Sequence, residues 1–249
     1  MNQIRIGILG YGNLGKGVEK AVERQTDMVL AGIYSRRRLD HPKAKDLDVL
    51  KRGEPLDVLI LCGGSAADLP EQTPQYSAYY NVIDSYDHHQ KIPAHYHAVD
   101  KRAKEGKKVA LISCGWDPGL FSMMRALFYA VLPNPNVFTF WGKGISQGHS
   151  DAIRRINGVK DAKQYTVPLE LSVKAAKGGE IKADEIAPEK MHRRECFVVA
   201  EEDADLSYIE EQIKTMPDYF AGYETVVHFI SQDRLNAEHS GMPHGGEIT

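Results

Sequence analysis

A glycine-rich turn near the start of the chain constrains the fold more than any other feature. Gly10, Gly12 and Gly15 follow the spacing G-x-G-x-x-G and connect an apolar run, Ile4 to Leu9, with a helical pattern that continues through Val22. A strand, a glycine turn and a helix in this order bind the pyrophosphate of a dinucleotide at the helix N-terminus. The sequence therefore predicts a Rossmann-type doubly wound parallel sheet in the first half of the chain.

The end of the second apolar run indicates which dinucleotide is bound. NAD-binding proteins place an Asp or Glu about twenty residues after the glycines, where it binds the ribose 2′-OH. Here the run Met28 to Tyr34 ends instead in Ser35, Arg36, Arg37 and Arg38. Guanidinium groups and a hydroxyl would bind a 2′-phosphate that a carboxylate would repel, so we expect NADP(H). The alternative is that the glycines only turn the chain and the arginines form a solvated surface run.

Composition excludes several classes of function. The chain has 249 residues and a net charge of -3, which argues against a nucleic-acid partner bound through its phosphates. No apolar run reaches membrane-spanning length, and we expect no signal peptide because a strand begins almost at Met1. The three cysteines form no C-x-x-C pair, which favours a reduced, cytoplasmic location.

Three further strands are expected in the first half of the chain, at Asp57 to Leu61, Asn81 to Asp84 and Lys108 to Ile112. A helix is expected from about Ile92 to Glu105, with Gly106 as its C-terminal stop. Ligands bind at the carboxyl ends of such strands, so the residues that follow them should line one crevice. These residues are Cys62, Gly63, Gly64 and Ser65, then Ser85, Tyr86 and Asp87, then Ser113, Cys114, Gly115, Trp116, Asp117, Pro118 and Gly119.

The second half has a different pattern. After a helix over about 120–132, a Pro-Asn-Pro-Asn connector leads into segments rich in β-branched and aromatic residues. We expect strands at 137–141, 165–171, 195–200 and 225–230, and helices at 150–156 and 206–216. The sequence thus predicts a dinucleotide-binding domain at 1–119 and an α+β substrate-binding and dimerisation domain at 120–249.

Several motifs, in order along nearly the whole chain, resemble meso-diaminopimelate D-dehydrogenase. They are Tyr11 to Leu14, Ser35 to Arg37, Cys62 to Ser65, Ser85 to Asp87, Gly115 to Gly119, Trp141 to Arg155, Met216 to Phe220 and Gly241 to Gly246. The resemblance implies a homodimer that carries out NADP-dependent, reversible oxidative deamination of meso-2,6-diaminopimelate at its D-centre. The product, L-2-amino-6-oxopimelate, cyclises to tetrahydrodipicolinate, and the amination direction supplies lysine biosynthesis.

The resemblance also implies two sets of site residues. The cofactor set is Gly10, Tyr11, Gly12, Asn13, Leu14, Gly15, Ser35, Arg36, Arg37, Cys62, Gly63, Gly64, Ser65, Ser85, Tyr86, Asp87, Gly115, Trp116, Asp117, Pro118 and Gly119. The substrate set is Asp87, Asp117, Trp141, Gln147, Gly148, Thr166, Arg194 and His244. Within it, Trp141, Gln147 and Gly148 match positions that hold the amino-acid backbone. Thr166, Arg194 and His244 match positions that bind a carboxylate, although the neighbouring Arg193 is an alternative to Arg194.

Asp87 and Asp117 suit the chemistry on independent grounds. Hydride leaves the α-carbon as an imine forms, so the substrate amine must be neutral, and a carboxylate at a strand end can bind the ammonium and accept its proton. Asp87 is the expected catalytic residue. The alternatives are that either Asp caps the following helix, or that Asp117 serves the turn with Pro118 and Gly119.

Other candidate sites are weaker. His88, His89, His95 and His97 straddle a turn and a helix start, and no Cys or second carboxylate completes a zinc set, so we expect no metal. Cys62 is expected to pack against the cofactor rather than to act as a nucleophile.

The end of the chain departs from the family pattern. The family continues past the position of Thr249 with another strand, a helix and a substrate-contacting Asn, so the C-terminal end is expected to be shortened. Two alternatives therefore stay open. One is another NADP oxidoreductase, such as a dihydrodipicolinate reductase or an aspartate-pathway dehydrogenase, and the other is a non-catalytic NADPH-binding module.

Overall fold

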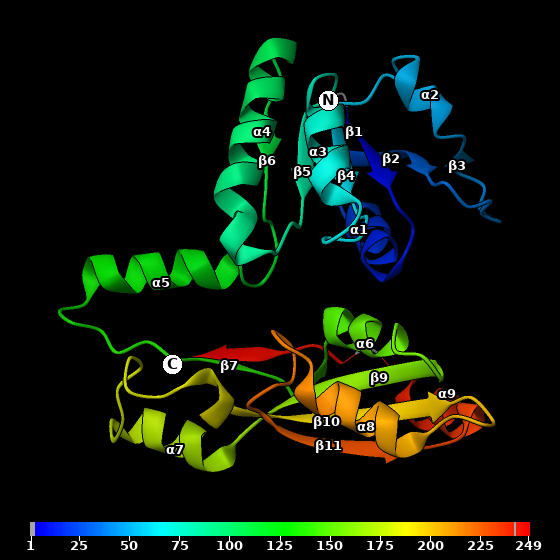
Figure 1. Cartoon of the computed structure of the whole chain (residues 1–249). Helices are drawn as coiled ribbons and strands as arrows, with labels where there is room; N and C mark the ends of the chain where they lie inside the picture. The colour runs from blue at the N-terminus through cyan, green and yellow to red at the C-terminus, as the bar shows by residue number, and fades with distance from the viewer. Residues whose placement is uncertain (1–2, 242) are drawn as a thin grey trace. The chain divides into compact units, whose positions relative to one another are not determined.

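The computed structural model describes residues 3–241 and 243–249. The chain divides into two compact units, Met1–Leu127 (unit 1) and Phe128–Thr249 (unit 2), each with its own sheet (Figure 1). The division falls within helix α5 (Leu120–Val131), whereas the sequence predicts a boundary just before this helix.

Unit 1 contains a six-stranded sheet in which every pair of neighbouring strands is parallel. Its strands lie in the order β3 (Ala44–Lys45), β2 (Met28–Tyr34), β1 (Ile4–Leu9), β4 (Val58–Leu61), β5 (Val82–Asp84) and β6 (Ala110–Leu111). The order 3-2-1-4-5-6 is that of doubly wound dinucleotide-binding folds. The predicted fold class is therefore confirmed.

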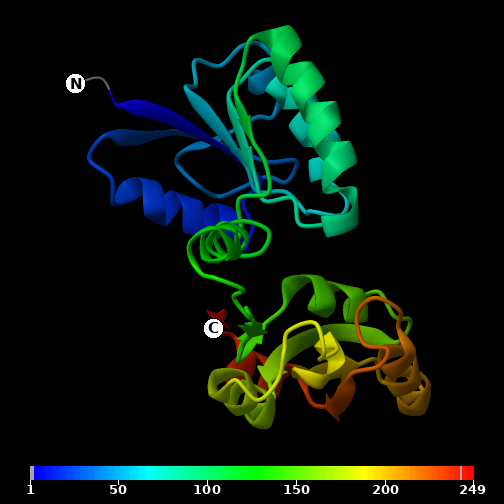
Figure 2. The ribbon, with the colours of Figure 1, turned by 90° about the vertical axis from the view of Figure 1, so that its left-hand side faces the viewer.

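Helices cover both faces of this sheet. They are α1 (Asn13–Glu23), α2 (Asp48–Lys51), α3 (Leu69–Ser77), the 3₁₀ turn η1 (His89–Lys91) and α4 (Ile92–Gly106). Figure 2 shows α1 on one side of the sheet and α3 and α4 on the other. Strand β4 alternates accordingly: Leu59 and Leu61 enter one hydrophobic core, and Val58 and Ile60 pack against the other.

Gly106 does not end α4 in the predicted way. It is the last residue of the helix, and the left-handed residue that follows is Lys107, with φ 54°. Glycine is required at 106 for another reason, because a Cβ there would lie 2.1 Å from the carbonyl oxygen of Ala78.

Unit 2 is α+β, as predicted. A four-stranded sheet has the order β11 (Glu224–Phe229), β10 (His192–Ala200), β9 (Val159–Pro168) and β8 (Gly144–Ile145). Its β10–β11 pair is parallel, and its other two pairs are antiparallel. Strands β7 (Thr139–Trp141) and β12 (Gly246–Ile248) form a separate antiparallel pair.

The helices of unit 2 are α6 (Gln147–Arg154), α7 (Glu170–Gly178), η2 (Pro188–Lys190), α8 (Leu206–Thr215) and α9 (Gln232–His239). Residues of α6 and α8 share one hydrophobic core with Ala162, Cys196 and Val198 of the sheet. The imidazole of His239 in α9 stacks on Phe197, which alternates in β10 with Cys196 and Val198 and so lies on the opposite face.

Two predicted segments were placed incorrectly. Helix α6 begins at Gln147 rather than Ser150, because the Ser146 side chain accepts the N–H of His149 and caps the helix earlier. Strand β9 ends at Pro168, so Glu170 and Leu171 belong to α7 and not to the expected strand.

Within the described ranges, no helix combines the length and the apolar character that crossing a membrane requires. The same residues contain no group of three or more His, Cys, Asp or Glu side chains that could hold a metal ion.

Candidate functional site

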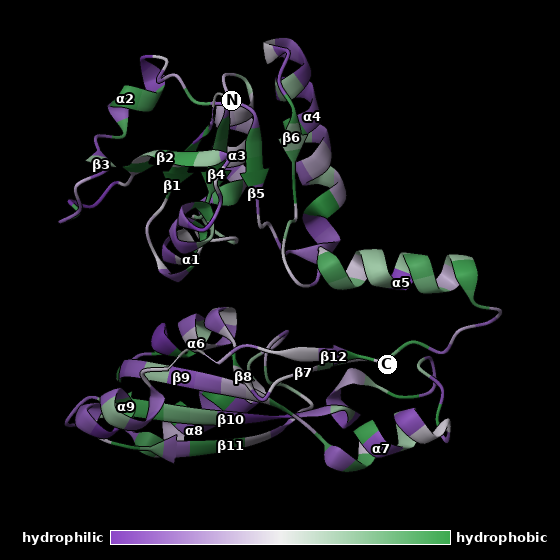
Figure 3. Cartoon of the chain, turned by 180° about the vertical axis from the view of Figure 1, so that it is seen from behind, coloured by the Kyte–Doolittle hydropathy of each residue, from purple (hydrophilic) through white to green (hydrophobic). Residues whose placement is uncertain are grey.

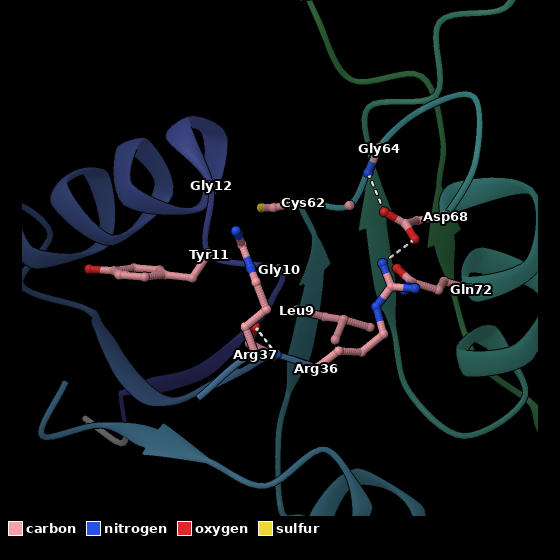
Figure 4. Close-up of a pocket in the computed structure, with 12 residues that line it drawn as sticks. Leu9, Gly10, Tyr11, Gly12, Arg36, Arg37, Cys62, Gly64, Asp68 and Gln72 are labelled. Carbon is pink, nitrogen blue, oxygen red and sulfur yellow. Dashed lines mark hydrogen bonds and ion pairs between the residues drawn. The ribbon is translucent and has the colours of Figure 1, made fainter. Parts of the chain in front are cut away.

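A cavity of about 470 Å³ lies at the carboxyl ends of β1, β2 and β4 (Figure 4). It brings together nine residues of the predicted cofactor set and three others. The predicted ones are Gly10, Tyr11, Gly12, Ser35, Arg36, Arg37, Cys62, Gly63 and Gly64, and the others are Leu9, Asp68 and Gln72.

The three fingerprint glycines differ in what they do. Gly10 has φ 95°, and a Cβ there would lie 2.9 Å from the carbonyl carbon of Cys62. A Cβ on Gly15 would lie 2.2 Å from the carbonyl oxygen of Gly10, so this glycine lets the helix approach the turn. Gly12 has no atom within 4 Å of a Cβ position, which leaves open space at the N-terminus of α1. That space fits a pyrophosphate.

Arg36 lines this cavity and is held by Asp68 (Figure 4). Its Nη2 lies 2.6 Å from Asp68 Oδ1, while Asp68 Oδ2 accepts the backbone N–H of Gly64 at 2.8 Å. Asp68 was not predicted, because the sequence does not reveal that the start of α3 folds back onto the preceding loop.

The remaining predicted cofactor residues do not line this cavity. They are Asn13, Leu14, Gly15, Ser65, Ser85, Tyr86, Asp87, Gly115, Trp116, Asp117, Pro118 and Gly119. Cys62 does line it, and burial raises the pKa of its thiol to about 12. Cys62 is therefore a neutral packing group at neutral pH, in keeping with the expectation that it is not a nucleophile.

Asp87 lies just beyond β5 and is exposed. Its backbone N–H donates to Ser65 Oγ at 2.9 Å, and the Ser65 hydroxyl in turn donates to the Asp87 carboxylate. The N-cap positions of η1 and α4 are His88 and Lys91, neither with a side-chain cap hydrogen bond. Asp87 therefore does not cap the following helices, and this alternative is wrong.

Asp117 is held by side chains of α5. Its carboxylate accepts a hydrogen bond from Ser122 at 2.8 Å and forms an ion pair with Arg125. Burial alone would raise the pKa of Asp117, but the contacts with Arg125 and Ser122 hold it below its usual value. Asp117 is therefore an ionised carboxylate at neutral pH, suited to binding a cation.

Unit 2 contains a second cavity of about 380 Å³, whose walls include Trp141 and Arg194. Arg194 is 8 % exposed and donates from Nη1 to Thr166 Oγ1 at 2.7 Å. Its guanidinium lies 4.1 Å from the centre of the Tyr223 ring. Within the part of the chain that the structure describes, Nε of Arg194 has no hydrogen-bond partner. A buried cation with a donor left over fits a carboxylate ligand.

Arg193 and Arg194 occupy different faces of β10. Arg194 pairs with Thr166 of β9 and is buried, whereas Arg193 pairs with Val167 and points to the opposite side. Arg194 is thus the arginine that contacts Thr166.

The other predicted substrate residues of unit 2 do not line the second cavity; they are Thr166, Gln147, Gly148 and His244. Gln147 and Gly148 begin α6. His244 is exposed. Its two neighbours accept backbone hydrogen bonds from the segment between Trp141 and Gln147: Gly142 N–H donates to Gly245 O and Ile145 N–H donates to Pro243 O, both at 2.8 Å. Met242 of the same motif lies outside the described residues.

A buried histidine supports Trp141 and was not predicted. His192 Nε2 accepts the backbone N–H of Trp141 at 2.8 Å, which ties β10 to β7. Burial, reinforced by Arg194, lowers the pKa of His192 to about 4, so this ring is neutral at neutral pH. Burial and the charge of Arg194 also lower the pKa of His149, to about 4.

Comparison with known sequences identifies the family. Residues 115–249 match the family described as diaminopimelic acid dehydrogenase C-terminal domain. The meso-diaminopimelate D-dehydrogenase of Ureibacillus thermosphaericus is 53% identical over 100% of this chain and 78% of its own. The enzyme of that name from Corynebacterium glutamicum is 48% identical over the same shares. The chain belongs to the meso-diaminopimelate D-dehydrogenase family.

Solved structures agree with this assignment. The C. glutamicum diaminopimelate (DAP) dehydrogenase in complex with DAP matches with a TM-score of 0.93 and 49% identity, over 100% of this chain and 78% of that one. An engineered D-amino acid dehydrogenase bound to NADP+ matches with a TM-score of 0.89 and 47% identity, over 99% and 77%. The predicted resemblance is confirmed, and members of the meso-diaminopimelate D-dehydrogenase family are oxidoreductases.

Proposed function

We propose that this protein catalyses the reversible, NADP-dependent oxidative deamination of meso-2,6-diaminopimelate at its D-centre. The observation that carries the proposal is the buried Arg194 with its spare donor, in a chain whose relatives are meso-diaminopimelate D-dehydrogenases. An amino acid with a second carboxylate far from the reacting centre supplies the anion that this guanidinium lacks.

The cavity of unit 1 is assigned to the cofactor. The open N-terminus of α1 at Gly12 would hold the pyrophosphate, and Arg36 and Arg37 would bind the 2′-phosphate. No carboxylate follows β2 at the position where NAD-binding proteins carry one. When bound, NADP+ accepts a hydride from the substrate α-carbon.

The cavity of unit 2 is assigned to the substrate. Arg194, which lines the cavity, would bind the carboxylate of the L-centre together with its partner Thr166 and with His244. Trp141, which also lines the cavity, would hold the amino-acid backbone with Gln147 and Gly148. Tyr223 fixes the guanidinium plane of Arg194 through its ring.

Asp87 and Asp117 are assigned different roles at the D-centre. Asp117 is kept ionised by Arg125 and Ser122 and would bind the substrate ammonium. Asp87 is exposed, with its orientation set by Ser65, and would accept the ammonium proton so that the neutral amine can become an imine. Water then adds to the imine and ammonia leaves, giving L-2-amino-6-oxopimelate.

The experiment is a comparison of stereoisomers. Purified protein is mixed with NADP+ and either meso- or L,L-diaminopimelate, and NADPH formation is followed by absorbance. We expect turnover of the meso isomer only, because the L,L isomer has no D-centre. Equal turnover of both would overturn the proposal. Binding of NADPH with turnover of neither would favour the alternative of a non-catalytic NADPH-binding module.

Three wider expectations stay predictions. A role in lysine biosynthesis and a cytoplasmic location follow from the proposed reaction and the unpaired cysteines. A homodimer is supported by large side chains that α5 exposes, among them Met123, Leu127 and Tyr129. Figure 3 colours most of α5 as hydrophobic. Sedimentation or light scattering of the purified chain tests the dimer.

A further inference from the structure

Asp84 is a buried carboxylate that the proposed mechanism does not use. It is the last residue of β5, three residues before Asp87, and its side chain is 0% exposed. A buried charge is stable only when hydrogen bonds replace its lost hydration. The groups that supply those bonds come from four different segments of unit 1.

The two carboxylate oxygens of Asp84 bind different parts of the fold. Oδ1 accepts the backbone N–H groups of Tyr86 at 3.0 Å and Ser113 at 2.8 Å. Oδ2 accepts from Thr73 Oγ1 at 2.7 Å and lies 2.8 Å from His95 Nε2. The Oδ1 contacts are to loops, whereas the Oδ2 contacts are to helices α3 and α4.

The loops bound by Oδ1 carry both candidate acidic residues. Tyr86 directly precedes Asp87, and its ring stacks on that of His95 with centroids 4.1 Å apart. Ser113 begins the loop that leads to Asp117 and has φ 59°, a conformation that non-glycine residues rarely adopt. The backbone carbonyl of Asp84 also accepts the N–H of Cys114 at 2.8 Å. Asp84 therefore fixes the starts of two loops, one after β5 and one after its neighbouring strand β6.

We infer that Asp84 is a positioning residue for the proposed reaction, because its Oδ1 holds the loops of Asp87 and Asp117 in register. This inference rests on the proposed function for the reaction concerned, but the hydrogen bonds can be tested without turnover. What the loops require is an acceptor at Oδ1, not the negative charge.

Two substitutions test separately whether the loops need a hydrogen-bond acceptor at the position of Oδ1 or a negative charge on residue 84. Asp84→Asn keeps an oxygen for the two loop amides and turns its NH₂ toward the Thr73 hydroxyl and the His95 ring, which can both accept. Asp84→Glu keeps the charge but adds a methylene to a filled site and displaces the oxygen. Thr73→Val is the matched control, since it removes a bond to Oδ2 and leaves both loop amides bound.

The first measurement is kcat and KM with meso-diaminopimelate and NADP+. We expect Asp84→Asn to stay within about tenfold of the wild-type kcat, and Asp84→Glu to lose about a hundredfold, as small misplacements of reacting groups do. KM for NADP+ should change little, because the cofactor cavity is lined by other segments. Thr73→Val should lower the melting temperature by a few degrees and leave kcat unchanged.

The second measurement is hydrogen exchange in peptides that cover 85–91 and 112–119. Asp84→Glu should speed exchange there and Asp84→Asn should not, whether or not the wild type turns over diaminopimelate. If the wild type is inactive, the proposed function fails and exchange alone decides the role of Asp84. The inference would be overturned if Asp84→Glu had the same kcat and the same exchange rates as the wild type. It would also be overturned if Asp84→Asn lost more than tenfold in kcat. A Thr73→Val variant that loses kcat as Asp84→Glu does would overturn it as well.

Discussion

Arg36 lies beside a carboxylate in a cavity that we assign to an anion. Asp68 bonds Nη2 of Arg36, which leaves further N–H donors on Arg36, and Arg37 lines the same cavity (Figure 4). The arginines were predicted from the residues after β2. The role of Asp68 was not predicted, because its contact with Arg36 depends on how the segment before α3, 32 residues further along the chain, folds back onto the loop after β4.

Replacing both Arg36 and Arg37 with Ser should weaken NADPH far more than NADH, which has no 2′-phosphate. Each charge-assisted hydrogen bond is worth roughly 1.5–3 kcal/mol, or about ten- to a hundredfold in affinity. Titration of the two cofactors by fluorescence measures both constants. Arg38 does not line the cavity, so Arg38→Ser is the control and should bind NADPH like the wild type. Equal losses for the two cofactors would refute the role.

Asp87→Asn keeps the shape and the oxygen that Ser65 bonds, but removes the base. Turnover should fall by about 10²–10⁴-fold, the usual contribution of a general base, while NADPH affinity stays the same. The unfolding midpoint should also stay close to that of the wild type, because Asp87 caps neither of the helices that follow it. Near-wild-type turnover would end the catalytic assignment.

Among the elements, β7 depends on a neutral histidine of β10. His192 can accept the N–H of Trp141 only while its Nε2 is unprotonated. Its folded pKa of about 4 lies below the ordinary value of 6.5, as does that of His149. The folded state therefore disfavours protonation of both rings. Their contribution to the free energy of unfolding is fully present above pH 6.5, the ordinary pKa of histidine, and is lost as the pH falls toward 4.

We expect the free energy of unfolding to fall as the pH is lowered from 6.5 toward 4. Each of these two histidines can contribute up to about 1.4 kcal/mol per pH unit. Urea unfolding at several pH values across this range measures how steeply the free energy of unfolding depends on pH. His192→Gln should flatten this dependence, whereas His97→Gln, at an exposed position, should not. An unchanged slope in His192→Gln would contradict the assignment.

Elements with a regular pattern were predictable, and those set by tertiary contacts were not. Strands β1 and β2 match their predicted bounds because predominantly apolar runs mark buried parallel strands. Helices α7 and α9 carry no strong apolar stripe, and the two-residue strands β3 and β8 are defined only by their partners. Similarly, Arg194 and Trp141 were predictable through the family resemblance, whereas His192 and Asp84 emerge only from hydrogen bonds across the fold.

At the scale of the molecule, each unit has its own core and its own candidate ligand cavity. Ligand binding should therefore protect different parts of the chain from hydrogen exchange. We expect NADPH alone to slow exchange around 10–15, 35–37 and 62–64 of unit 1. Protection by NADPH confined to the segments of Trp141 and Arg194 would contradict the division of roles. Binding stabilises the folded protein by mass action, by about 2.7 kcal/mol when the free NADPH concentration is a hundredfold above its Kd.

The cysteines have a practical consequence for following these loops. Cys62 and Cys196 are buried, and burial raises the pKa of each thiol to about 12. Partial burial and Asp84 also raise the pKa of Cys114, but this residue is exposed and reagents can reach it. A maleimide dye should therefore attach to the native protein at Cys114 alone, with a stoichiometry of one and no engineered site. That dye would sit next to Ser113, on a loop bound by Asp84. Its emission would then report loop movement in real time as substrate and cofactor are added.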